Sequence, residues 1–217
     1  MEAYIKFYAQ VNQNTAIQLQ SIIEQLLLQG MKSLHLLLST PGGSVHDGIS
    51  IYNLLKGLHI KINTYNFGSV DSIGLFIFCA GENRYSVPHA RFLFHPVTMQ
   101  VNIPQMFDEP LIEEKLKLLK ADQTNILKVI STTINKSVEE VQKLIHDRVA
   151  LEPEEALKLR LVTKIQSSLV PAGTQLFSIY DNIQHQGMQL PLQLPLRGIV
   201  QPNQENFTSI HHSFTTI

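Results

Sequence analysis

The most constraining feature of this chain is the alternation of strand-like and helix-like apolar segments along its first third. Segments rich in aliphatic, β-branched and aromatic residues predict strands at 4–11, 33–39 and 60–67. Apolar residues at helical spacing follow each strand and predict helices at 16–27, at 49–57 and from about Ser72 onward. Strands that alternate with helices form βαβ crossovers, so we expect an α/β fold around a parallel sheet.

The middle of the chain predicts further elements of the same domain. Two short strands are expected at 84–87 and 90–95, and a long helix from Leu111 to about Ile130. Ser137 and Glu140 have the spacing of a capping box at the start of another helix. A short helix after Pro153 and a strand at 160–165 complete the pattern.

The composition divides the chain into a folded domain and a tail. The 217 residues, 44% of them hydrophobic, can bury a core of ordinary domain size. Residues 166–217 are rich in Gln, Pro, Ser, Thr and Asn and carry little charge, which is typical of segments without a packed core. We therefore expect one domain over 1–165 and a flexible or partner-docked tail over 166–217.

Charge and cysteine content exclude several classes of function. The formal net charge of −1 and a pI near 6.8 provide no basic surface for nucleic acid or anionic membranes. The single cysteine, Cys79, excludes a disulfide framework, and the chain shows neither a signal peptide nor an apolar run long enough to cross a membrane. We expect a soluble protein of the cytoplasm.

Two turns carry residues suited to acyl-transfer chemistry. Gly42 and Gly43 follow the second strand, where the lack of a Cβ lets backbone N–H groups face a ligand. Ser72 follows the third strand and opens a helix, and Gly74 completes an S-x-G sequence that resembles half of a nucleophile elbow. Taken separately, the first is also typical of an ordinary turn, and the second of a helix N-cap.

A nucleophilic serine needs a base, and His95 is the best candidate among the nine histidines. It ends an apolar strand, where its side chain would emerge at the edge of the sheet, whereas His46 and His89 lie on turns and are weaker candidates. No histidine pair has the spacing of a metal site. The sequence therefore predicts neither a metal nor a cofactor.

Three motifs in order resemble the proteolytic subunit of the Clp protease, a serine peptidase of the ClpP/crotonase-like fold. They are "STPGGSVHDGISIYNLL", "GSVDSIGLFIFCAGENRYSVPHARFLFHP" and "HDRVALEPEEALKLRLV", and the likeness covers about residues 4–165. The resemblance implies stacked βαβ units with a projecting handle helix. It also implies Ser72 as nucleophile, His95 as general base and acid, the N–H groups of Gly43 and Ile73 as oxyanion hole, and Gly42 and Gly43 as the substrate-binding strand.

Two positions depart from the family pattern. Counted without a gap from the following motif, the place of the triad aspartate holds Arg148, and a shift of one residue is needed to place Asp147 there. With that shift, Asp147 is the third catalytic residue. Asp71 stands where the family has a small apolar residue, and it is expected to be a solvated or capping carboxylate.

The resemblance implies polypeptide substrates and a homo-oligomer, a heptameric ring that can be doubled. An ATP-driven unfoldase is the family's partner, but the chain starts almost at the first core strand, and the absence of the axial segment argues against that docking. Two other functions stay open. One is a catalytically impaired, ring-forming regulatory subunit, and the other is an acyl-CoA enzyme of the crotonase type, which shares the fold and uses two backbone N–H groups to stabilise an enolate.

Overall fold

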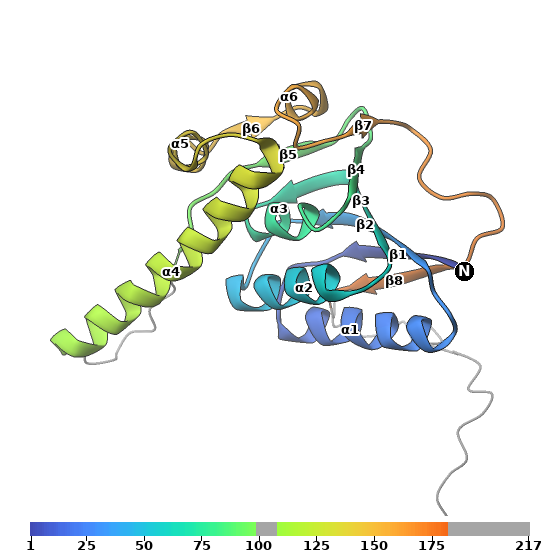
Figure 1. The fold of residues 1–217 in the computed structure, drawn as a ribbon, viewed down its shortest axis with the longest axis horizontal. Coiled ribbons are helices and arrows are strands. Elements are labelled where there is room, and N and C mark those ends of the chain that lie inside the picture. Colours follow the sequence, from blue (N-terminus) through green and yellow to red (C-terminus); the bar gives the residue numbers. More distant parts are fainter. Residues whose placement is uncertain (99–107, 182–217) are drawn as a thin grey trace, which may run out of the picture. The chain divides into compact units, whose positions relative to one another are not determined.

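The computed structural model describes residues 1–98 and 108–181 (Figure 1). The strands are β1 (Glu2–Tyr8), β2 (Ser33–Thr40), β3 (Lys61–Asp71), β4 (Asn83–Ser86), β5 (Arg91–Leu93), β6 (Ala150–Leu151), β7 (Lys164–Ile165) and β8 (Leu176–Tyr180). The helices are α1 (Gln13–Leu28), α2 (Val45–Gly57), α3 (Ile73–Phe78), α4 (Glu109–Ile134), α5 (Val138–His146) and α6 (Pro153–Lys158).

All the strands belong to one sheet. Its main path runs β6-β5-β3-β2-β1-β8, and β4 pairs with both β3 and β7 away from this path. Every strand pair is parallel except β5 with β6, which is antiparallel. This mixed α/β architecture confirms the predicted fold class, and the 26-residue helix α4 corresponds to the predicted handle (Figure 1).

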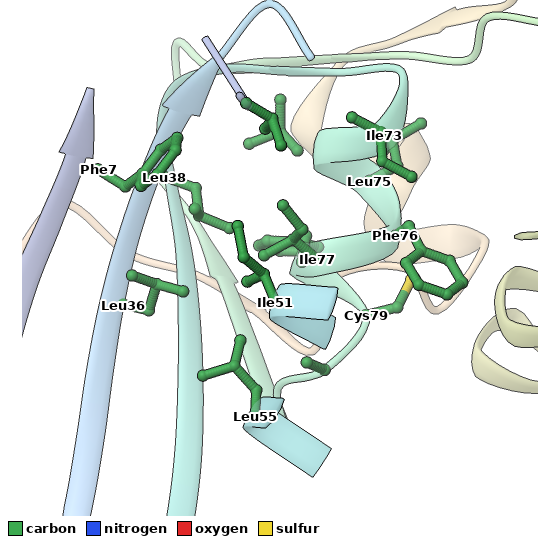
Figure 2. Packing of buried hydrophobic residues seen from close by; sticks show 14 of the residues in the cluster. Phe7, Leu36, Leu38, Ile51, Leu55, Ile73, Leu75, Phe76, Ile77 and Cys79 are labelled. Carbon is green, nitrogen blue, oxygen red and sulfur yellow. The ribbon is translucent and has the colours of Figure 1, made fainter. Parts of the chain in front are cut away.

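One face of the sheet packs against the first three helices and forms the main core. Side chains of β1 and β2, such as Phe7, Leu36 and Leu38, meet Ile51 and Leu55 of α2 (Figure 2). The residues of α3 are all buried, which explains why the sequence of this short helix is continuously apolar. The packing fixes α3, and with it the residue that precedes it, against the ends of β2 and β3.

The opposite face carries a second, smaller cluster. Because side chains alternate along a strand, Tyr4, Leu37 and Tyr65 point away from the main core. His35 stacks on Tyr4 with the ring centroids 4.2 Å apart, and its Nδ1 lies 2.8 Å from the Tyr65 hydroxyl oxygen. Val170, from the segment after β7, packs against this cluster.

The structure extends the folded unit beyond the boundary expected at residue 165. Residues 176–180 form β8, which pairs in parallel with β1, and its Ile179 is fully buried in the main core. The strand "LFSIY" has only five residues and lies in a segment whose composition is that of a tail. Its alternating apolar residues are therefore not recognised from the sequence. The rest of the predicted tail, residues 182–217, lies outside the described residues.

The sequence-based elements agree with the structure apart from their bounds. Ser137 and Glu140 form the predicted capping box of α5, and α2 ends at Gly57 as expected. β3 is longer than expected and continues through Asp71, so that the strand leads directly into the turn at Ser72. Among the described residues, no helix is both long enough and apolar enough to traverse a bilayer.

Candidate active site

Ser72 occupies a strained turn between β3 and α3. Its backbone angles are φ 55° and ψ −124°, in a region that residues with a side chain rarely adopt. It stands at the N-cap position of α3, yet its side chain makes no capping hydrogen bond. The interpretation of Ser72 as an ordinary N-cap is therefore not supported, and its hydroxyl is left available at a sharp strand-to-helix turn.

Two glycines allow neighbouring segments of the chain to pack closely against this turn. A Cβ on Gly74 would lie 2.5 Å from the Thr40 side chain at the end of β2. A Cβ on Gly42 would lie 2.8 Å from Ser72 Cβ. Larger residues at these two positions would push apart the loop after β2 and the start of α3, so the glycines are required for the close approach.

Gly43 presents its backbone amide away from its neighbouring strand. It forms an isolated parallel bridge with Val11, in which Val11 N–H donates to Gly42 O at 2.8 Å and Ser44 N–H donates to Val11 O at 2.7 Å. The Gly43 N–H therefore points to the other side, because successive amides of an extended chain alternate in direction. Neither this amide nor that of Ile73 donates a hydrogen bond to another described residue.

His95 lies just beyond β5, after the fully buried Phe94. Its Nδ1 is 2.8 Å from the carbonyl oxygen of Pro96. A carbonyl oxygen can only accept, so in the neutral ring Nδ1 carries the proton and Nε2 keeps its lone pair. This is the tautomer that a general base needs.

Ser72, Gly43 and His95 line one groove of about 660 Å³. The groove runs between the carboxyl ends of the strands and α4, which contributes Leu119 and Asp122. No hydrogen bond joins Ser72 Oγ to His95 among the described residues. The apolar side of the site continues into a smaller recess beside Ser72 and His95, lined by Val45, Leu75, Phe94, Val97, Ile126, Ile130 and Ile145.

Asp147 is not brought to His95. It ends α5, and its Oδ1 lies 3.0 Å from Nδ1 of His146 on the exposed side of that helix. The antiparallel pairing of β5 with β6 continues as Phe94 N–H donates to Val149 O at 2.9 Å, and the preceding residue, Arg148, belongs to the turn that ends α5, where its N–H donates to Ile145 O. Asp147 as third catalytic residue stays a prediction.

Asp71 differs from the expectation of a solvated or capping carboxylate. Its side chain is only 9% exposed, and its Oδ2 accepts a hydrogen bond from the Arg91 guanidinium at 3.0 Å. Its Oδ1 accepts another from the Ser69 hydroxyl at 2.6 Å. Asp71 is buried because β5 lies beside the end of β3, with Ser69 opposite Arg91. Sequence reasoning missed this pair, although the position of Ser69 two residues before Asp71 places both on one face.

The other candidates lie elsewhere. His46 is exposed in the first turn of α2 and His89 is exposed in a turn, and neither lines the groove. Cys79 is buried, and desolvation raises the pKa of its thiol to about 11. Its thiol is therefore protonated at neutral pH and is a poor nucleophile.

Comparison with known proteins identifies the family. The model of the Clp protease family matches residues 1–168. The chain belongs to the Clp protease family. The proteolytic subunit 2 of the ATP-dependent Clp protease from Chlamydia trachomatis (serovar D) is 29% identical to it over 154 residues, which is 68% of this chain and 74% of that protein. The corresponding subunit of Chlamydia muridarum is 29% identical over 157 residues, with the same coverage of both chains.

A solved structure of a ClpP1 mutant from Listeria monocytogenes has the same fold. It superposes with a TM-score of 0.68 at 22% identity and covers 76% of this chain and 91% of that one. The family resemblance of the sequence and the predicted ClpP-like fold are thus confirmed. As a member of the Clp protease family, the chain is a Clp-type peptidase, and oligomeric rings are typical of this family.

Proposed function

We propose that this protein is a serine endopeptidase that hydrolyses unfolded polypeptides through an acyl-enzyme. The observation that carries the proposal is the backbone of Ser72, which holds an uncapped hydroxyl at φ 55° and ψ −124° in the groove that His95 also lines. The strain would be unnecessary for a capping serine, whose usual backbone is extended.

In the proposed reaction, Nε2 of His95 takes the proton of the Ser72 hydroxyl while the oxygen bonds to the carbonyl carbon of the substrate. The amides of Gly43 and Ile73 donate to the oxyanion. The C–N bond then breaks, the proton of His95 passes to the leaving amine, and water hydrolyses the ester. The Pro96 carbonyl supports this scheme because it selects the required tautomer of His95.

The groove favours an extended substrate of little sequence specificity. A peptide that lies along Gly42 and Gly43, on the side away from Val11, would bind mainly through its main chain. Such recognition suits a peptidase that degrades many unfolded chains.

A catalytically impaired, ring-forming subunit is the second candidate. It is favoured by the pairing of Asp147 with His146 and by the bond of His95 Nδ1 to the Pro96 carbonyl, since no carboxylate of the described residues bonds to His95. A neutral carbonyl also stabilises the imidazolium of the transition state less than a carboxylate does. In either case we propose self-assembly into a heptameric ring, and the role of an unfoldase stays a prediction.

Labelling with a fluorophosphonate tests the proposed function. We expect the purified protein to gain one mass increment, with the modified peptide containing Ser72, and Ser72→Ala to gain none. Ser44→Ala is the matched control, because Ser44 lines the same groove but caps α2 through the amide of Asp47. An unlabelled wild-type protein that still forms rings would instead support the impaired subunit.

A further inference from the structure

We propose that Arg91 is a positioning residue of the hydrolytic site and acts through Asp71, whose negative charge it neutralises beside the developing oxyanion. The inference rests on the proposed function and adds a residue to it. It explains how a chain can keep an acidic residue directly before its nucleophile.

The pair is built into the site. The Asp71 carboxylate accepts from Arg91 at 3.0 Å and from Ser69 at 2.6 Å, and its side chain is 9% exposed against 58% for Arg91. Two bonded oxygens hold the carboxylate in one orientation under the turn at Ser72. The exposed guanidinium keeps part of its hydration, so burial penalises the pair less than a fully buried one.

Asp71 is the residue directly before Ser72. Asp71 lines the groove together with Ser72 and His95, and it also lines a smaller cavity of about 280 Å³ that includes Arg91, Tyr8 and Asp181. Asp122 adds a further acidic group to the groove. Among the described residues that line these two cavities, Arg91 is the one lysine or arginine. Without it, no lysine or arginine lining these cavities would compensate the charge of Asp71.

The size of this effect is large enough to measure. At the intermediate effective dielectric of a protein surface, a unit charge several ångströms from the oxyanion changes the rate by roughly tenfold or more. The helix dipole cannot replace Arg91, because α3 has only six residues.

A structural role for the same pair has to be separated from this electrostatic one. Arg91 starts β5, which leads to His95, and the side-chain amide of Asn66 donates through Nδ2 to the Arg91 carbonyl at 2.7 Å. The Ser72 N–H also donates to Leu93 O at 2.9 Å. These two bonds, together with the backbone pairing of β3 with β5, tie the strands without the ion pair, so neutral variants of the pair should retain the strand pairing.

A double-mutant cycle tests the proposal, with the rate of fluorophosphonate labelling at Ser72 and the kcat and KM for a peptide as readouts. Arg91→Gln is expected to lower the labelling rate and kcat about tenfold with little change in KM, because it leaves Asp71 uncompensated. Asp71→Asn is expected to raise the labelling rate above that of the wild type. The double variant should label faster than Arg91→Gln alone, and Arg91→Lys should retain most of the rate.

Lys136→Gln is the matched control, since it removes the cation of an exposed ion pair, with Glu140 at 2.8 Å, and neither residue lines the groove or its recess. Rates are normalised to the folded fraction measured by circular dichroism. If the wild type is labelled but the double variant is labelled no faster than Arg91→Gln, this inference is overturned while the proposed function stands. If Arg91→Gln does not fold, slower labelling of Asp71→Asn than of the wild type overturns it. Absence of labelling in the wild type would overturn the proposed function and this inference together.

Discussion

At the scale of single residues, the site depends on backbone conformations that the surrounding packing imposes. Ser72 has a positive φ of 55°, and Gly43 has a φ of 145° with Val11 O only 2.1 Å from where its Cβ would be. Such conformations persist only where neighbouring contacts over-determine them. The S-x-G and P-G-G motifs are therefore informative as a pair, because each glycine is required by a close approach rather than by the turn alone.

Whether Asp147 takes part in catalysis can also be tested with a single substitution. We expect Asp147→Asn to change kcat/KM by less than about threefold, because its carboxylate bonds to His146 and not to His95. Loss of a triad aspartate costs about four orders of magnitude in rate. The measurement is kcat/KM for a fluorogenic peptide, with Asp47→Asn in α2 as control. A loss of a hundredfold or more would mean that Asp147 reaches His95 during catalysis.

At the scale of elements, the strand after the predicted domain end is part of the core. β8 pairs with β1 along Tyr4 to Tyr8, and the Gln10 N–H donates to both carboxylate oxygens of Asp181 at 3.1 and 3.0 Å. Both contacts lie just before Val11, which bridges to Gly43. The added strand thus supports the segment on which the proposed oxyanion loop rests.

Removing the buried side chain of β8 should destabilise the whole fold. We expect Ile179→Ala to lower the free energy of unfolding by about 2–4 kcal/mol, because Ile179 is fully buried in the main core. Leu176→Ala on the same strand is the control, with a side chain 37% exposed and an expected loss below about 1 kcal/mol. Urea unfolding measures both. Equal, small losses would show that β8 adds little to the core.

At the scale of the whole molecule, α4 presents apolar side chains that nothing in the described chain covers. Ile112, Leu116 and Leu118 are 54%, 46% and 49% exposed. Ile112 and Leu116 are four residues apart and therefore share one side of the helix. Exposed apolar side chains grouped on one element are typical of an association surface, which fits the rings usual in this family.

Association through α4 can be tested by sedimentation. We expect the 24.5-kDa chain to sediment as a ring of seven copies or as a doubled ring. Ile112→Glu with Leu116→Glu should convert the doubled form to smaller species, because it places charges in the apolar contact. Leu28→Glu is the matched control, since Leu28 is 90% exposed at the end of α1. A wild-type monomer would contradict the expectation.

The sequence by itself determined the α/β class, most elements and the chemistry-bearing turns. Local signals such as the capping box of Ser137 and the glycines at 42, 43 and 74 act over a few residues, so they can be recognised without the fold. Order along the chain was also enough to relate Ser72 and His95, because consecutive parallel strands end at the same edge of a sheet.

Only the tertiary structure decided which side chains meet across strands. The pairing of Asp71 with Arg91 and the addition of β8 beside β1 both depend on strand neighbours and register. A shift of one residue exchanges the two faces of a strand, and no local spacing in the sequence reports that choice. Long-range pairing, not residue preference, therefore set the electrostatics of the site.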